Sequence, residues 1–336
     1  MNALHPDSDA LTEVPSQSGP SFSSLAANGP KVLWIVSSGG HLVQATHIER
    51  LIGAHPDSVW ITNDVPQARS LLANRNVVYV DYVAPRDLRG AIRAAKIASR
   101  VAKEMSPDQI ISTGAAIAGV ALPRLAIAGH TTTFVESVAR RTTRSLTGRI
   151  SALSPRVRTL TQYADRANRR WAFDGTILAN WERRGGLTGE YDDRPLRVFV
   201  TLGTIRPYRF DTAVEAMLKI LRPDDEVVWQ LGETSRPHLP GESHESMSNA
   251  QLRRHVDRAD VVVSHAGVGT IVDTLEASKC PVLLVRRAER NEHVDDHQLD
   301  IAGELQQRGL GYELDLNDPH RDILLSASAA RAVRVT

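Results

Sequence analysis

The clearest pattern of hydrophobic and polar positions runs from Val261 to Gln298. Three β-branched apolar residues, 261–263, predict a buried strand. A tight turn with two glycines, Gly267 and Gly269, follows at once, and a second apolar run at 281–285 predicts another buried strand. In an open α/β sheet, the ligand binds in the loops beyond the carboxyl ends of the strands. This stretch is therefore expected to carry a ligand site.

The helix expected after the glycine turn indicates what kind of ligand would bind. We expect Thr270 to be its N-cap, with Asp273 three positions later as a short version of the capping box. The free amides at a helix start favour anions, and glycines let the backbone approach a ligand closely. A polar run at 291–298 follows the second strand. The pattern predicts a diphosphate-containing ligand between these two loops.

The same plan of strand, glycine-rich turn and helix opens the first half of the chain. Residues 31–37 predict a strand, 37–41 a turn with two glycines, and 42–53 an amphipathic helix. Strands are also expected at 59–62, 77–83, 108–113 and 131–137, and helices at 87–105 and 119–129. This alternation predicts an α/β fold with a mostly parallel, doubly wound sheet.

The alternation resumes after a polar, glycine-rich stretch that predicts an interdomain linker. The expected units are a mostly disordered tail at 1–30, a first domain at 31–182, the linker at 183–195, a second domain at 196–316, and a C-terminal segment at 317–336. Within the last segment, residues 322–335 predict a helix that packs back on the first domain.

Composition limits the class of protein. The chain has 336 residues, of which 42% are hydrophobic and 24% charged, as in soluble globular proteins of two domains. A net charge of +1 gives no strong signature of nucleic-acid binding. The single cysteine, Cys280, is expected to be a small buried residue in a reducing compartment. No apolar run has the length of a transmembrane helix, and residues 1–30 lack the pattern of a signal peptide.

Charge is concentrated in residues 138–172, where nine arginines accompany one acid, Asp165. The helix expected around 87–105 is also basic. Such a run is either a solvated face or a surface for phosphate, in anionic lipid headgroups or in a pyrophosphate substrate. The aromatic residues of this segment, Tyr163 and Trp171, are too few to favour base stacking with a nucleic acid.

Several common catalytic motifs are absent. The sequence has no zinc-type Cys/His spacing, no P-loop and no G-x-S-x-G motif. His293 and His297 are four positions apart, but the glutamate of a metalloprotease helix is missing. Asp7 and Asp9 form the one Asp-x-Asp pair, in the predicted tail. We therefore predict no metal and no cofactor, and expect helix amides and arginines to stabilise a departing nucleotide diphosphate.

Several segments resemble GT-B glycosyltransferases of the family 28 type, which use UDP-sugars. Those similar to the donor-binding half are VFVTLGT at 198–204, SHAGVGTIVDTLE at 264–276 and RRAERNEHVDDHQ at 286–298. Those similar to the acceptor-binding half are SSGGHL at 37–42, ISTGAAIAG at 111–119 and VESVARRTTRSLTGRI at 135–150. The chain resembles a fusion of the two halves of bacterial exopolysaccharide UDP-sugar transferases and of the two-subunit dolichol-linked chitobiose N-acetylglucosaminyltransferase. This resemblance implies an α/β fold of the GT-B type, with two Rossmann-like domains facing each other across a cleft.

The resemblance also implies roles for individual residues. The general base on the acceptor hydroxyl would be His41, with Glu136 as an alternative, and transfer would invert the anomeric carbon. Asp273 stands where relatives have a glutamate toward the ribose. The implied donor-binding residues are Gly203, Thr204, Ser264, His265, Gly267, Gly269, Thr270, Asp273, Glu292, His293, His297 and Gln298. The implied acceptor-binding residues are Gly39, Gly40, Thr113, Gly114, Arg140, Ser145, Thr147 and Gly148.

The expected function is transfer of a hexosyl group from a UDP-sugar to a polyprenyl-diphosphate-linked sugar in surface or exopolysaccharide synthesis. The enzyme would bind the anionic inner face of the cell membrane peripherally, without nucleic acid and without an obligatory protein partner. Two alternatives stay open: a UDP-sugar 2-epimerase-like enzyme, and a non-catalytic UDP-sugar-binding subunit. UDP-glucuronic acid, UDP-N-acetylglucosamine, UDP-glucose and UDP-galactose all fit as donors. Arg286, Arg287 or Arg290 would pair with a uronic carboxylate unless these arginines belong to a solvated loop.

Overall fold

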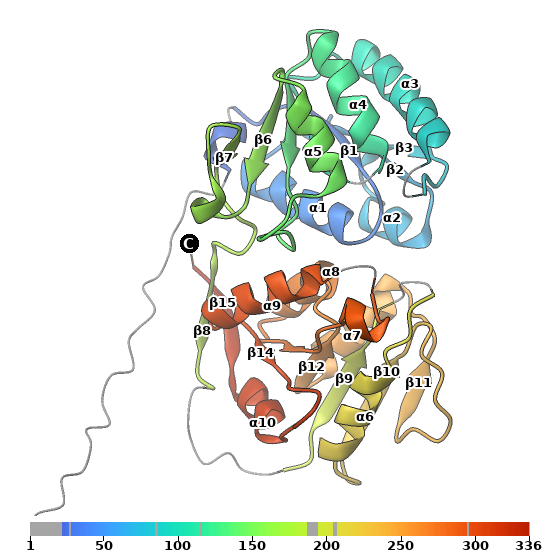
Figure 1. The fold of residues 1–336 in the computed structure, drawn as a ribbon, viewed down its shortest axis with the longest axis vertical. Coiled ribbons are helices and arrows are strands. Elements are labelled where there is room, and N and C mark those ends of the chain that lie inside the picture. Colours follow the sequence, from blue (N-terminus) through green and yellow to red (C-terminus); the bar gives the residue numbers. More distant parts are fainter. Residues whose placement is uncertain are drawn as a thin grey trace, which may run out of the picture.

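The computed structural model describes residues 22–26, 28–84, 87–114, 116–186, 194–203, 207–293 and 296–335. Within these residues the chain forms two domains, stacked one on the other (Figure 1). Each domain is built on a parallel sheet, and a two-stranded ribbon lies beside them. The prediction of two doubly wound α/β domains is confirmed.

The first domain holds a seven-stranded sheet in the spatial order β3-β2-β1-β4-β5-β6-β7, with parallel neighbours throughout. Its strands are β1 (Val32–Val36), β2 (Val59–Asn63), β3 (Asn76–Val80), β4 (Gln109–Gly114), β5 (Thr132–Val135), β6 (Val157–Thr161) and β7 (Trp171–Phe173). Its helices are α1 (Gly40–Ile52), α2 (Pro66–Leu71), α3 (Leu88–Met105), α4 (Ala116–Ile127) and α5 (Leu146–Leu153). All five residues of β1 are buried, because α1 packs on one face of the sheet while α3 and α4 pack on the other.

The second domain repeats the design with a six-stranded sheet in the order β11-β10-β9-β12-β13-β14. Its strands are β9 (Arg197–Thr201), β10 (Glu226–Gln230), β11 (Glu242–His244), β12 (Val261–Ser264), β13 (Val282–Leu283) and β14 (Tyr312–Glu313). Its helices are α6 (Asp211–Ile220), α7 (Asn249–Arg258), α8 (Val268–Glu276), α9 (His297–Gln307) and α10 (Asp322–Ala329). The buried strand predicted at 261–263 is β12, which lies in the middle of this sheet.

Helices α1 and α8 bring the two domains together. A Cβ placed on Gly40 lies 3.7 Å from Cβ of Val268, and one placed on Gly269 lies 3.6 Å from Cγ2 of Val43. Residues of both helices belong to one continuous apolar cluster. In Figure 1, α1 forms the lower side of the first domain and faces α8 and α9 of the second. The two glycine turns singled out in the sequence therefore meet at the domain boundary.

Part of the predicted tail is folded on the first domain. Phe22 and Leu25 are fully buried in the apolar cluster that contains β1 and α1, and Ser23–Leu25 forms a 3-10 helix, η1. The Phe22 amide donates to the Asp174 carbonyl at 2.6 Å, and the Ser24 amide to the Asp174 carboxylate at 3.2 Å. The polar composition of residues 1–30 masked these two apolar anchors, so the folded domain begins earlier than Lys31.

The predicted linker and C-terminal helix also differ from the structure. Residues 181–184 form β8 (Trp181–Arg184), which pairs antiparallel with β15 (Arg331–Arg334), so the chain crosses between the domains as a ribbon. The predicted helix at 322–335 is the shorter α10, and its apolar residues join the core of the second domain. The segment was expected to pack on the first domain as a helix, but only β15 reaches the chain that leaves that domain.

The arginine-rich segment 138–172 contains structure that its charge concealed. It folds as α5, β6, the 3-10 helix η2 (Ala164–Arg166) and β7. The Arg170 guanidinium donates to the carbonyls of Ser151, Ser154 and Val157, and Arg144 lies 4.4 Å above the Trp171 ring. Several of these arginines therefore hold the fold together, while others, such as Arg149, are exposed.

Candidate functional site

The candidate site lies where the strand order of each sheet reverses. Strand β1 lies between β2 and β4, so the loops after β1 and β4 diverge and leave a crevice at their carboxyl ends. His41 follows β1, and Thr113 lies at the end of β4. The His41 ring is bonded through Nδ1 to the Thr113 carbonyl oxygen at 2.8 Å, and the Thr113 hydroxyl donates to the His41 carbonyl at 2.8 Å.

The bond to Thr113 decides which nitrogen of His41 is basic. A carbonyl oxygen only accepts, so Nδ1 carries the proton and Nε2 keeps its lone pair. Burial lowers the pKa of His41 from 6.5 to about 4; the bond to Thr113 opposes this, and the charges of Arg140 and His297 add to it. The imidazole is therefore neutral at pH 7. Such a ring accepts a proton from a hydroxyl that approaches Nε2.

Glycine is required at position 114 because the His41 ring rests on it. The residue has φ +128°, and a Cβ there would lie 2.8 Å from Cε1 and 3.0 Å from Nδ1 of His41. Two residues before His41, Gly39 is the N-cap of α1, and its amide donates to the Gln67 side chain at 2.7 Å. Of the predicted acceptor residues, Gly39, Gly40, Thr113 and Gly114 thus surround the candidate base.

The second domain contains a matching arrangement around His265. This residue follows β12, and its Nδ1 is 3.3 Å from the carbonyl oxygen of Thr201 at the end of β9. Burial lowers the pKa of His265 to about 4, with a further contribution from the charge of Arg286. A Cβ on Gly203 or Gly267 would lie 2.6 or 2.4 Å from Nε2 of this ring. Both glycines are therefore needed to hold His265 between the two loops.

Helix α8 begins three residues earlier than predicted. Its N-cap is Gly267, with φ −80° and ψ 128°, and no side chain caps the helix. The prediction that Thr270 is the N-cap is wrong, because Thr270 lies inside the first turn and is buried. The glycine cap leaves the first amides of α8 without a side-chain acceptor, so an anion can take that place.

Two other predicted donor residues are held inside the protein. Ser264 is fully buried, and its hydroxyl has no hydrogen-bond partner among the described residues. Asp273 forms an ion pair with Arg253 of α7 at 3.4 Å, and burial raises the pKa of its carboxyl. In this structure Asp273 therefore joins α8 to α7. Thr204 lies outside the described residues.

Arg286 organises the loops of the second domain, which sequence reasoning did not foresee. Its side chain is 1% exposed and lies 4.6 Å above the Phe210 ring. The guanidinium donates to the carbonyls of Leu202, Tyr208, Arg209 and Glu292. Burial lowers its pKa to about 10. Arg286 was predicted either to be solvated or to pair with a uronic carboxylate. Both predictions are wrong for this residue, because its side chain is buried and its guanidinium is bonded to loop carbonyls.

The loop between β13 and α9, together with the first turn of α9, contains four predicted donor residues. The Glu292 carboxylate accepts from the Arg287 amide at 3.0 Å and from Nε of Arg290 at 3.0 Å, and it also binds Thr212. The Gln298 side chain accepts from the Arg286 amide at 3.1 Å. These two residues therefore shape the loop from within.

His293 of this loop and His297, the first residue of α9, pack on each other. The His293 and His297 rings meet edge to face with centroids 4.7 Å apart, and Tyr208 stacks on His293 at 6.2 Å. His297 begins α9 and lies close enough to His41 to lower its pKa. A cavity of about 330 Å³ adjoins this loop; its lining includes Tyr208, Arg209, Arg290 and Glu292.

Glu136, the alternative base, caps a helix instead of facing the crevice. Its carboxylate is 1% exposed and accepts from the amides of Ser137 at 3.2 Å and Ser145 at 3.0 Å. Ser145 is in turn the N-cap of α5 and accepts from the Gly148 amide at 3.0 Å. A Cβ on Gly148 would lie 2.5 Å from Glu136. Of the two candidates, the geometry favours His41.

The remaining predicted acceptor residues lie around this helix start. Thr147 is half-buried in the first turn of α5, and Arg140 lies close enough to His41 to affect its pKa. Among the described residues, no three histidine, cysteine or carboxylate side chains are grouped to hold a metal ion. No helix in the described ranges is both long and apolar enough to cross a membrane.

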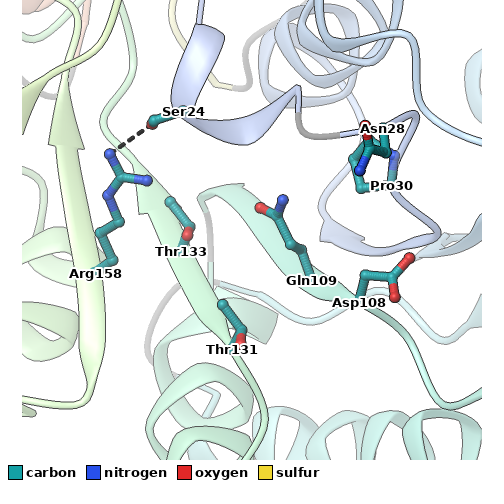
Figure 2. A pocket seen from close by; sticks show the side chains of 8 residues that line it. All are labelled: Ser24, Asn28, Pro30, Asp108, Gln109, Thr131, Thr133 and Arg158. Atoms are coloured by element: carbon teal, nitrogen blue, oxygen red, sulfur yellow. Dashed lines mark hydrogen bonds between the residues drawn. The ribbon is translucent and has the colours of Figure 1, made fainter.

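A larger cavity of about 430 Å³ lies at the opposite edge of the first sheet. Figure 2 shows its lining, in which Arg158 donates to Ser24 of the N-terminal segment. Asp108, Gln109 and Thr131 come from the amino ends of β4 and β5. This cavity is therefore remote from the crevice that holds His41 and Thr113.

Comparison with known proteins relates the second domain to a family of glycosyltransferases. Residues 197–317 match the model of the glycosyltransferase family 28 C-terminal domain. The UDP-N-acetylglucosamine transferase subunit ALG13 of Yarrowia lipolytica is 41% identical over 54 residues, which are 16% of this chain and 26% of that protein. The human protein of the same name is 36% identical over 58 residues, 17% of this chain and 5% of that protein. The matched segment thus spans 26% of the first of these curated relatives and 5% of the second.

Solved structures match over nearly the whole chain. MurG of Acinetobacter baumannii has 17% identity, covers 88% of this chain and 89% of its own, and gives a TM-score of 0.54. The calicheamicin glycosyltransferase CalG4 has 14% identity, with 89% and 88% covered and a TM-score of 0.52. The UDP co-structure of S. aureus MnaA has 9% identity, with 89% and 91% covered and a TM-score of 0.56. The predicted GT-B fold is confirmed, as is the resemblance to family 28.

Proposed function

We propose that this chain, which carries a glycosyltransferase family 28 C-terminal domain in a GT-B fold, transfers a hexosyl group from a UDP-sugar to a polyprenyl-diphosphate-linked sugar. One observation carries the proposal. The base-like His41 and the uncapped start of α8 lie on opposite sides of the same domain boundary, where Gly40 approaches Val268. In the proposed reaction, this arrangement puts a proton acceptor on one side of the anomeric carbon and an anion site on the other.

The proposed chemistry follows from these positions. Nε2 of His41 takes the proton of the acceptor hydroxyl, and the hydroxyl oxygen attacks the anomeric carbon of the donor sugar. The bond from that carbon to the β-phosphate oxygen breaks, and UDP leaves with the bonding electrons. The amides of Val268, Gly269 and Thr270 stabilise the charge that develops on the diphosphate. A single displacement of this kind inverts the anomeric configuration.

UDP-N-acetylglucosamine is the first donor to test, because the relatives matched over the short segment are named as subunits of a UDP-N-acetylglucosamine transferase. A UDP-sugar with a uronic carboxylate is the second donor to test, because Arg209 and Arg290 line the cavity beside this loop. Both arginines also pair with carboxylates of the protein, Arg209 with Asp211 and Arg290 with Glu292. The sugar therefore has to be identified by assay.

The acceptor side of the proposal is supported by the surface of the first domain. Helices α3, α4 and α5 lie side by side, and they expose Leu88, Ile92 and Leu153 together with basic residues such as Arg93 and Arg149. Apolar side chains among cations suit an anionic bilayer surface, where a polyprenyl diphosphate is embedded. We expect the protein to bind the cytoplasmic face of a membrane peripherally.

Vesicle flotation tests this surface. The protein should float with anionic vesicles at low salt and less with neutral vesicles. Replacing Leu88 and Leu153 by serine should reduce binding, whereas Leu218→Ser, which alters an exposed leucine of the second domain, should not. Equal flotation of all three proteins would remove the surface from the proposal.

The activity is tested by incubating the full chain with the four UDP-sugars and lipid extracted from membranes, and by measuring the release of UDP. Release that needs both one UDP-sugar and the lipid is the expected result. An epimerised nucleotide sugar without any lipid would indicate a 2-epimerase instead. Binding of a UDP-sugar with no turnover under any condition would indicate a non-catalytic binding subunit.

A further inference from the structure

Helix α9 of the second domain holds the loop of the first domain that connects β5 to α5. Oδ2 of Asp300 accepts three hydrogen bonds: from the Arg141 amide at 3.0 Å, from the Thr142 amide at 2.9 Å, and from the Thr142 hydroxyl at 2.9 Å. One turn further along α9, Glu304 accepts from Nη1 of Arg141 at 2.6 Å. Gln307 accepts from the same nitrogen at 3.1 Å.

These contacts are more than an ordinary surface ion pair. The Glu304 side chain is 7% exposed and that of Arg141 27%, and the Arg141 guanidinium also binds Asp165 and lies 5.3 Å from the centre of the Tyr163 ring. The Tyr163 hydroxyl binds the Val138 carbonyl, at the start of the same loop. Two of the bonds to Asp300 come from backbone amides, which fix the path of the chain and not only the position of a side chain.

The position of the loop relative to the candidate base gives these contacts a functional meaning. The Arg141 amide shares its rigid peptide plane with the Arg140 carbonyl, so Asp300 fixes the backbone on one side of Arg140. On the other side, the Arg140 amide donates to the Ser137 carbonyl at 2.9 Å. The same loop is bonded to α1, the helix that carries His41: the Gln44 side chain accepts from the Val138 amide at 2.9 Å and donates to the Ser137 hydroxyl at 3.0 Å. The charges of Arg140 and of His297, which begins α9, both lower the pKa of His41.

We propose that Asp300 and Arg141 form a latch between the domains, in which the donor-side helix α9 assembles the acceptor-side loop. Asp300 is then a positioning residue for Arg140 beside His41. The consequence is that the acceptor site is complete only when the second domain is docked on the first. The part concerning the acceptor rests on the proposed function; the part concerning the loop does not.

Hydrogen exchange measured by mass spectrometry on the full chain tests the latch without any substrate. In Asp300→Ala, the amides of the peptide that covers 138–145 should exchange about tenfold faster or more, because hydrogen bonds to charged groups are the strong class. Asp318→Ala removes an acid that is 81% exposed on the same domain and should change nothing in this peptide. Unchanged exchange in a folded Asp300→Ala protein would refute the latch.

Steady-state kinetics tests the positioning role. Asp300→Ala should raise KM for the acceptor or lower kcat by about tenfold or more, while the affinity for UDP stays within about twofold. Asp300→Asn keeps one oxygen that accepts from the amides, so it should recover part of the loss. Equal losses of UDP affinity and acceptor use would indicate general damage and contradict a positioning role. If the unaltered protein shows no transfer at all, the proposed function fails while the exchange result still decides the latch.

Discussion

The contact between Gly114 and the His41 ring gives a sharp test of how the candidate base is placed. In Gly114→Ala, the new Cβ would lie 2.8 Å from Cε1 of His41 at a residue with φ +128°. An ordinary contact begins at 3.4 Å, so the ring has to retreat by about 0.6 Å. The bond from Nδ1 to the Thr113 carbonyl, 2.8 Å in this structure, then lengthens and fixes the ring less firmly.

Both consequences have an expected size. Strain of the backbone at such a φ costs about 1–3 kcal/mol of the free energy of unfolding. A displacement approaching 1 Å at a catalytic group lowers the rate by up to about 100-fold. We therefore expect kcat to fall about 10- to 100-fold in Gly114→Ala, with a moderate loss of stability.

Gly129→Ala separates these two effects. Gly129 has φ +96°, but a Cβ there would meet nothing within 4 Å. It lies beyond α4, away from the site, so its substitution reproduces the strain without moving His41. Urea unfolding and UDP release are measured for both variants. If Gly114→Ala lost no more activity than Gly129→Ala, the account of how His41 is positioned would be refuted.

Three further predictions concern pH, the buried arginine and the N-terminal segment. The pKa of His41 is lowered from 6.5 to about 4, so its imidazole stays neutral at pH 6.5. We therefore expect kcat/KM to decline only as the pH approaches 4. A pH profile of kcat/KM that already falls with a midpoint near 6.5 would contradict this. Arg286→Met leaves four carbonyls without their donor, so the free energy of unfolding should fall by about 3 kcal/mol or more. UDP binding, measured by calorimetry, should be lost in the same variant. Arg209→Met, at a half-exposed arginine, should lower the free energy of unfolding by less than about 1 kcal/mol. Phe22→Ala should cost about 3–5 kcal/mol in urea unfolding and the exposed Ser23→Ala almost nothing, and equal midpoints would show that the segment is not part of the fold.

The sequence predicted the strands and turns that carry the site because their signal is local. A buried strand is indicated by the apolar run 261–263. The end of a strand and the start of a helix are indicated by the glycines at 39–40 and 267–269. The interactions of His41 and His265 could not be predicted in the same way. Each depends on a carbonyl of a neighbouring strand, Thr113 or Thr201, that is 64 or more positions away in the chain.

The errors have the same origin. Thr270 looked like an N-cap because its type favours that position, but packing of the glycine turn starts α8 earlier. Arg286 looked solvated because arginines in loops usually are, but four loop carbonyls converge on its side chain. Phe22 was hidden in a polar segment, since one aromatic residue gives no periodicity. Tertiary contacts decided all three.

In the proposed function, His41 is the base of a UDP-sugar transferase whose donor binds at the start of α8. The most direct measurement compares lipid-dependent UDP release and UDP affinity in the unaltered protein and in His41→Ala, with His320→Ala as a control at a histidine that is 68% exposed. UDP release should fall about 100-fold or more in His41→Ala while UDP affinity stays within about twofold, because the base acts on the acceptor and not on the nucleotide. Unchanged release in His41→Ala, from a protein whose activity needs both donor and lipid, would contradict it.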